Sequence, residues 1–168
     1  YTFKKKLGLS YIKAKGHYPE SNKEKRVEYI EKLNKIEEES CDEDVILFED
    51  ECSLSNTATV SYKWAEKGKQ PKVEQKQSNK ERVTLFGGVD RKRGIVITQK
   101  AERGNAITFK KFLKKILRKL RKYKGKIWLI LDNVKYHHAK LLKPFLDKYK
   151  DRLILVFLPP YSPDLNHM

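Results

Sequence analysis

Two apolar runs of strand length, each followed by an aspartate, constrain the fold of this chain more than any other feature. Residues 45–48 lead toward Asp50, and residues 127–131 lead directly to Asp132. Runs this apolar predict strands buried on both faces of a sheet, with their acidic ends at its rim. Two aspartates at one rim predict a site for a hard, oxygen-ligated cation such as Mg²⁺. Taken alone, either aspartate is better explained as an acid that opens a turn or caps a helix; the pair, in a strongly basic chain, favours the metal interpretation.

The acidic residues beside Asp50 make the choice of ligand a question of strand geometry. Glu49 and Glu51 flank it, and the two-residue period of a strand places them on the opposite face. Asp50 shares its face with the apolar residues at 46 and 48, and Asp132 shares its face with those at 128 and 130. This parity favours Asp50 over its neighbours as the partner of Asp132.

The order of the remaining elements predicts an α/β fold, a mixed sheet flanked by helices. We expect strands at about 44–50, 59–64, 81–89, 94–99 and 152–158, beside the run at 127–131. Helices are expected at 22–38, 106–123 and 138–149. Ser21 followed by Glu24 predicts a capping box for the first helix, whose apolar stripe would be Val27, Ile30, Leu33 and Ile36. Hairpin-connected strands followed by helix, strand, helix and strand fit one central sheet with helices on its faces.

The charge balance predicts a polyanionic partner. Lys and Arg number 38 against 22 Asp and Glu, a net charge of +16; the alternative is a lysine-rich proteome that decorates every surface. The helix at 106–123 concentrates this charge, and no acidic residue lies between Glu102 and Asp132. A merely solvated face would usually include compensating Glu, so we predict that a strip of cations contacts the phosphates of double-stranded DNA. The strip comprises Lys110, Lys111, Lys114, Lys115, Arg118, Lys119 and Lys122.

Two further polar residues follow Asp132. Asn133 either forms hydrogen bonds to the ligands of the predicted metal without binding the metal itself, or caps the next helix. His137 either orients a water or phosphate near the metal or is a packing or capping histidine, which is the commoner role.

The sequence also indicates a cellular compartment. Cys41 and Cys52 lack the spacing of a zinc site or disulfide framework, which fits a reducing cytoplasm. No apolar run approaches membrane-spanning length, so no membrane partner is expected. Because the chain begins at Tyr1 rather than Met, we expect it to be part of a longer protein.

Together these motifs resemble the DDE transposases of the mariner superfamily, in the branch of prokaryotic insertion sequences. The resemblance rests on residues 48–51, on Trp64, Gly68 and Pro71, on residues 131–133 with His137, and most specifically on Leu158-Pro-Pro-Tyr-Ser-Pro-Asp-Leu-Asn166. It covers residues 44–168 and implies a ribonuclease H-like catalytic domain there. Residues 1–20 then resemble the tail of a helix-turn-helix DNA-binding region, and residues 21–43 would be a linker helix.

The resemblance implies Mg²⁺- or Mn²⁺-dependent cutting and joining of transposon ends by three acids. Asp50 matches the first acid and Asp132 the second. The third would directly follow Met168, where this sequence stops, and Asp164 belongs to the turn motif rather than replacing it. We therefore expect an incomplete domain that lacks its C-terminal part and is inactive as it stands.

Three functions follow from these observations. The first is a transposase catalytic domain that acts on transposon ends and target DNA, with a possible homodimer in the intact protein and a nucleoid-associated cytoplasmic location. The second is a DNA-binding remnant without catalysis, which would bind DNA regardless of Mg²⁺. A ribonuclease H-type nuclease on RNA–DNA hybrids is the third, and the motif at 158–166 argues against it.

Overall fold

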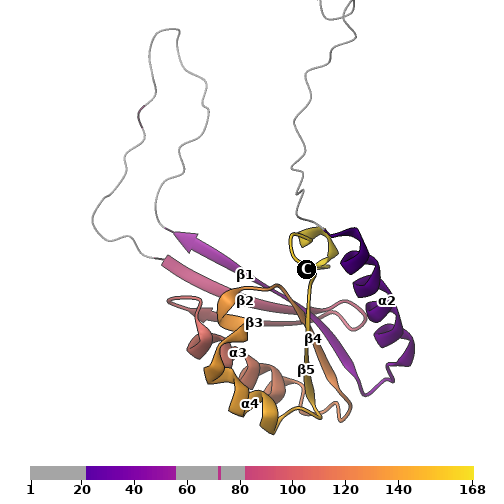
Figure 1. The fold of residues 1–168 in the computed structure, drawn as a ribbon. Coiled ribbons are helices and arrows are strands. Elements are labelled where there is room, and N and C mark those ends of the chain that lie inside the picture. Colours follow the sequence, from indigo (N-terminus) through magenta and orange to yellow (C-terminus); the bar gives the residue numbers. More distant parts are fainter. Residues whose placement is uncertain (1–21, 56–71, 73–81) are drawn as a thin grey trace, which may run out of the picture.

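A five-stranded mixed sheet organises the molecule. The computed structural model describes residues 22–55, 72 and 82–168. Within them the strand order is β3-β2-β1-β4-β5 (Figure 1). The strands are β1 (Val45–Ser55), β2 (Arg82–Asp90), β3 (Ile95–Ala101), β4 (Ile127–Leu131) and β5 (Leu153–Phe157). β1, β4 and β5 are parallel, β2 is antiparallel to β1, and β3 is antiparallel to β2, so the predicted α/β fold class is confirmed. The strand predicted at 59–64 lies outside the described residues.

The central strand β1 is longer than predicted. It pairs with β4 from Val45 to Phe48 only, but its pairing with β2 continues from Phe48 to Ser55. The apolar run therefore marks the part of β1 that pairs with β4, and the two pairings meet at Phe48. The polar remainder stays a strand because β2 supplies its hydrogen bonds.

One face of the sheet is covered by α3 (Ala106–Lys119) and α4 (Lys143–Lys148) (Figure 1). Asn105 caps α3 through a capping box with Thr108. The predicted apolar face of α3 packs, together with Leu142 and Phe145, on odd-numbered residues of β1 and β4 such as Leu47. α3 ends four residues before the predicted 123, because its last turn closes at Leu120.

α2 (Lys23–Glu39) covers the other face (Figure 1). The predicted helix is confirmed, and its predicted stripe is correct at Leu33 and Ile36 but wrong at Val27 and Ile30. The side chain of Asn22 accepts a hydrogen bond from the N–H of Lys25, and Ser21, the predicted cap, lies outside the described residues. The buried residues are Tyr29, Leu33 and Ile36, whereas Val27 and Ile30 are 54% and 42% exposed. A helix packed on a sheet buries only a narrow stripe of its surface. In α2 this stripe contains Tyr29, where the prediction had Ile30.

The helix predicted at 138–149 is also wrong in its first half. Residues 135–138 and 140–142 form two 3₁₀ turns, and only Lys143–Lys148 is α-helical. Pro144 occupies the first turn of α4, where a missing N–H costs nothing. In the described part of the chain, no helix has the length and apolarity needed to cross a membrane.

Candidate active site

The strand register brings Asp50 and Asp132 to the same end of the sheet. β1 and β4 pair in parallel from Val45 opposite Ile127 to Phe48 opposite Ile130. Asp50 lies on β1 two residues past the last pair, and Asp132 lies two residues past it on the other side, just beyond the end of β4 at Leu131. By strand alternation Asp50 belongs to the face that packs under α2, because Phe48 is in that cluster.

The surroundings of the two aspartates suit a hard cation. Asp50 is exposed, and one of its oxygens accepts a 2.8 Å hydrogen bond from the N–H of Glu51. The side chain of Asp132 is 45% exposed, and one oxygen accepts a 3.1 Å bond from the N–H of Val134. The other oxygen of each carboxylate has no hydrogen-bond partner among the described residues. Accessible carboxylate oxygens on rigid elements are what Mg²⁺ and Mn²⁺ require.

Hydrogen bonds hold the C-terminal motif, residues 158–166, near Asp50 and Asp132. The Asn133 amide donates to the carbonyl of Leu158, and the Asn166 amide donates to the carbonyl of Glu49 at 2.8 Å. A groove of about 450 Å³ runs from Asp132 along residues 158–163. Asn133 therefore acts on the backbone that frames the site and does not cap a helix.

Asp164, in the same motif, forms a bidentate ion pair with Arg26 of α2, at 2.6 and 3.1 Å. This pairing fits its placement in the turn motif and not in a set of acids with Asp50 and Asp132.

The last residues of the chain lie next to Asp50. Its cross-strand partner on β2 is Gly87, and a Cβ at Gly87 would collide with the terminal methyl of Met168. The His167 ring lies 5.0 Å from the ring of Phe48, two residues before Asp50. The residue after Met168 would therefore begin within reach of the two aspartates.

His137 lies behind the pair. Its side chain is fully buried, with Nδ1 at 3.1 Å from the backbone oxygen of Asp132 and 3.3 Å from Asp132 Oδ1. Its Nε2 lies 3.3 Å from Glu51 Oε1. His137 is thus a buried residue that contacts the backbone of the turn after β4, and its predicted role near a metal stays a prediction.

Glu49 is the polar residue to which sequence reasoning gave no role. It is 1% exposed on the α3 face of β1, and neither carboxylate oxygen has a hydrogen-bond partner in the described structure. Burial, together with the neighbouring Glu51, Asp132 and Asp50 carboxylates, raises its pKa to about 9. A glutamate at an inward position of an apolar strand is the signal that could have drawn attention to it.

The structure places the basic strip of α3 away from the two aspartates. α3 packs on the face of Leu47, whereas Asp50 belongs to the opposite face of the sheet. None of the seven cations forms an ion pair in the described part of the chain. Lys115 donates to the carbonyl of Thr98 at 2.5 Å, and the Lys110 ammonium lies 5.8 Å from the Phe145 ring. Lys122 follows the end of the helix.

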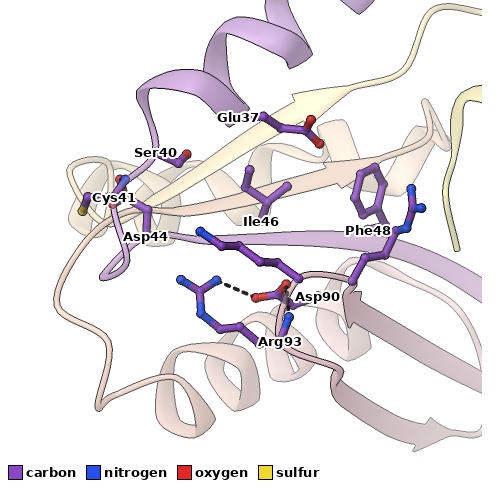
Figure 2. A pocket seen from close by; sticks show the side chains of 10 residues that line it. Glu37, Ser40, Cys41, Asp44, Ile46, Phe48, Asp90 and Arg93 are labelled. Atoms are coloured by element: carbon purple, nitrogen blue, oxygen red, sulfur yellow. Dashed lines mark hydrogen bonds and ion pairs between the residues drawn. The ribbon is translucent and has the colours of Figure 1, made fainter.

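A pocket of about 550 Å³ lies on the aspartate face but does not include either aspartate (Figure 2). Ile46 and Phe48 contribute apolar lining, and Glu37, near the end of α2, lies at one side (Figure 2). At the other side Arg93 pairs with Asp90 at 2.9 Å. Because its lining holds three acids (Glu37, Asp44, Asp90) and three bases (Arg91, Lys92, Arg93), this pocket has no single charge that would select a ligand.

Comparison with known proteins identifies the class. Residues 45–168 match the model of the DDE superfamily endonuclease family, and the chain belongs to that family. No curated protein sequence matches it.

Solved structures of the Mos1 mariner transposase share the fold. A paired-end complex with Mn has a TM-score of 0.62 at 18% identity, covering 95% of this chain and 51% of that one. The Mos1 strand transfer complex has 0.62 at 19% identity, covering 98% and 51%. The isolated catalytic domain of Mos1 has 0.56 at 15% identity, covering 90% and 67%. The chain thus has a ribonuclease H-like fold and spans about half the length of the Mos1 chains in the two complexes.

Proposed function

We propose that this chain is the catalytic domain of a transposase of the prokaryotic insertion-sequence branch, and that Asp50 and Asp132 hold its Mg²⁺ or Mn²⁺. The observation that supports this most is the place of two accessible aspartates, each two residues beyond the last pair of the parallel strands β1 and β4, in a DDE-family chain. Structures of the Mos1 transposase were solved with Mg and with Mn, and one contains a transposon end. The proposed substrate is the end of a transposon, acted on in the nucleoid-associated cytoplasm.

The two carboxylates have a defined task in this proposal. A divalent cation supplies Lewis-acid stabilisation of the charge that develops on the phosphate oxygens during in-line attack. Asp50 and Asp132 present oxygens on strands held by a shared sheet, so little reorganisation is needed to bind the ion. Asn166 contributes by fastening the C-terminal motif to the carbonyl of Glu49, one residue from Asp50.

A third acid belongs to the same proposal. In the family pattern it follows the segment that ends here in His167-Met168, and Met168 lies against Gly87, opposite Asp50. We expect the 168 residues by themselves to cleave DNA poorly, because two carboxylates leave a two-metal site short of a ligand. A version that continues past Met168 with a glutamate should gain cleavage activity.

DNA contact by α3 is a separate part of the proposal. The strip lies across the sheet from the aspartates, so the same stretch of phosphates would not touch both. α3 would then hold a second segment of DNA, or a second end in a homodimer of the intact protein. The unpaired cations of α3 are also what favours the alternative function, a non-catalytic DNA-binding remnant.

Metal binding and cleavage test the proposal together. Mg²⁺ binding by calorimetry is compared between the chain, the Asp50→Asn/Asp132→Asn double variant and a control variant Asp147→Asn on the exposed side of α4. We expect Mg²⁺ heat in the parent and the control and none in the double variant. Cleavage of transposon-end DNA by the glutamate-extended chain should likewise disappear with Asp132→Asn. Equal Mg²⁺ binding in all three proteins, with DNA binding that ignores Mg²⁺, would support the DNA-binding remnant.

A further inference from the structure

Three acceptor groups converge behind the two aspartates, on the opposite face of β1. Glu49, Glu51 and His137 each offer one ligand atom, and these atoms all lie within 4.8 Å of one another. Glu49 is 1% exposed, the Glu51 side chain 12%, and the His137 side chain 0%. The cluster is therefore largely buried, and unpaired polar atoms are costly in such a place.

The hydrogen bond of His137 fixes its tautomer. Nδ1 lies 3.1 Å from the backbone oxygen of Asp132. A carbonyl can only accept, so Nδ1 carries the proton and Nε2 of the neutral ring keeps its lone pair. Histidines that bind metals are oriented in the same way, with the far ring N–H donated to a carbonyl or carboxylate.

The atoms that face this lone pair are also acceptors without donors. Glu51 Oε1 lies 3.3 Å from His137 Nε2, yet neither atom has a hydrogen bond in the described structure. The two carboxylate oxygens of Glu49 also have no hydrogen-bond partner there. One imidazole nitrogen and two carboxylates thus share a largely buried space, and no Lys or Arg of the described residues pairs with these carboxylates. A cation is the kind of ligand that such a set lacks.

We propose that Glu49, Glu51 and His137 form a second metal site, distinct from the Asp50–Asp132 pair and suited to Zn²⁺ or a similar transition ion. Two carboxylates and a neutral imidazole would balance the charge of a divalent cation. Donors about 2.1 Å from a tetrahedral ion are about 3.4 Å apart, close to the 3.3 Å between Glu51 Oε1 and His137 Nε2. Rotation of the Glu49 side chain would bring in the third donor.

Ligand chemistry separates the two sites. The aspartate pair offers only oxygen, which suits Mg²⁺, whereas an imidazole donor favours Zn²⁺ and related ions over Mg²⁺. A groove of about 400 Å³ lined by Glu51, Thr84 and Tyr136 lies beside the cluster and gives an ion a path to it. Bound there, the ion would tie β1 to the turn that carries Asp132.

Equilibrium dialysis against Zn²⁺ in excess Mg²⁺ tests the site. The background is the full chain with Cys41→Ser and Cys52→Ser, because both thiols are free and exposed and could bind zinc. We compare Glu49→Gln and His137→Gln with His138→Gln, which alters the neighbouring exposed histidine that stacks on Phe157. Zinc per chain is measured by atomic emission, and folding by circular dichroism.

We expect one tightly held Zn²⁺ in the background protein and in His138→Gln. Glu49→Gln and His137→Gln should weaken it by at least about 100-fold, since loss of an outer partner alone costs 10–100-fold. Asp50→Asn/Asp132→Asn should retain zinc, so failure of the proposed function would leave this result intact. Equal zinc in Glu49→Gln and its parent would overturn the site, as would none in the parent.

A second measurement does not depend on variants. Crystals of the unmodified chain soaked in Zn²⁺ should show an anomalous peak about 2.1 Å from His137 Nε2. Zinc found only at the aspartates, at cysteines or at the surface would refute the proposal. Such a result would mean that the cluster holds a proton in place of a metal ion.

Discussion

Glu49→Gln should stabilise the metal-free protein at neutral and alkaline pH. The pKa of Glu49 is raised to about 9, chiefly by burial, from an ordinary value of 4.5. Between these values the folded protein keeps the proton while the unfolded chain has released it. Stability is therefore unaffected below pH 4.5 and falls as pH rises toward 9. Glutamine has the shape of the neutral acid but no proton to lose. The free energy of unfolding of the variant therefore should not decrease as the pH rises toward 9.

The size of the effect follows from linkage. Each pH unit between the two pKa values costs about 1.4 kcal/mol, so at pH 7.5 the wild type should be less stable than Glu49→Gln by on the order of 4 kcal/mol. Urea unfolding in the presence of a chelator, repeated from pH 6 to pH 9, measures it. Glu28→Gln, which removes an exposed acid of α2, is the matched control and should follow the wild type.

Parallel stability curves for the wild type and Glu49→Gln would refute the reasoning. They would mean that the Glu49 carboxylate finds a donor or water in solution and is not the unpartnered group that the structure shows. Adding Zn²⁺ in place of the chelator gives a further check. If the proposed metal site exists, zinc should restore wild-type stability at pH 8 and leave Glu49→Gln unchanged.

Three other predictions concern the scaffold around the site. Asn166→Ala removes the bond to the carbonyl of Glu49 and should lower the free energy of unfolding by about 1–2 kcal/mol in urea titrations. Gly125→Ala places a Cβ 2.7 Å from the backbone carbonyl of Glu43 and should cost about 1–3 kcal/mol in the same assay. Burial opposes the charged form of Asp44, but hydrogen bonds from backbone N–H groups outweigh it and lower its pKa. Stability from Asp44 is thus present above its ordinary pKa and lost as pH falls through the lowered one, so Asp44→Asn should flatten acid unfolding measured by circular dichroism.

The parallel core of the fold was predictable because its signals are local. Apolar runs that fill both faces of a strand identified β4 and the first half of β1, and apolar spacing identified α3. The extension of β1 to Ser55 could not be predicted, since its polar residues are strand only through pairing with β2. The two 3₁₀ turns before α4 were missed for a similar reason. The turn is shaped by the contact of His137 with the backbone of Asp132, which no spacing rule encodes.

The sequence likewise predicted one part of the candidate site and not another. Strand parity placed Asp50 and Asp132 on one face, and it placed Glu49 and Glu51 on the other. Strand alternation cannot predict how deeply a side chain is buried, because the same pattern fits a glutamate exposed to solvent and one covered by a helix. The depth of Glu49 comes from α3, which the sequence could place only as a helix of unknown partner.

The register of β1 decides which of its three consecutive acids is available for chemistry. A slip of one residue would bury Asp50 under α3 and expose Glu49, and the apolar run alone does not oppose it, because both faces of residues 45–48 are apolar. Gly87 of β2 opposes it. Gly87 lies opposite Asp50, and a Cβ there would collide with the Met168 side chain. Gly87 therefore leaves room for the C-terminal segment at the one register that presents Asp50, and Gly87→Val should displace that segment and weaken Mg²⁺ binding while leaving the zinc cluster behind it intact.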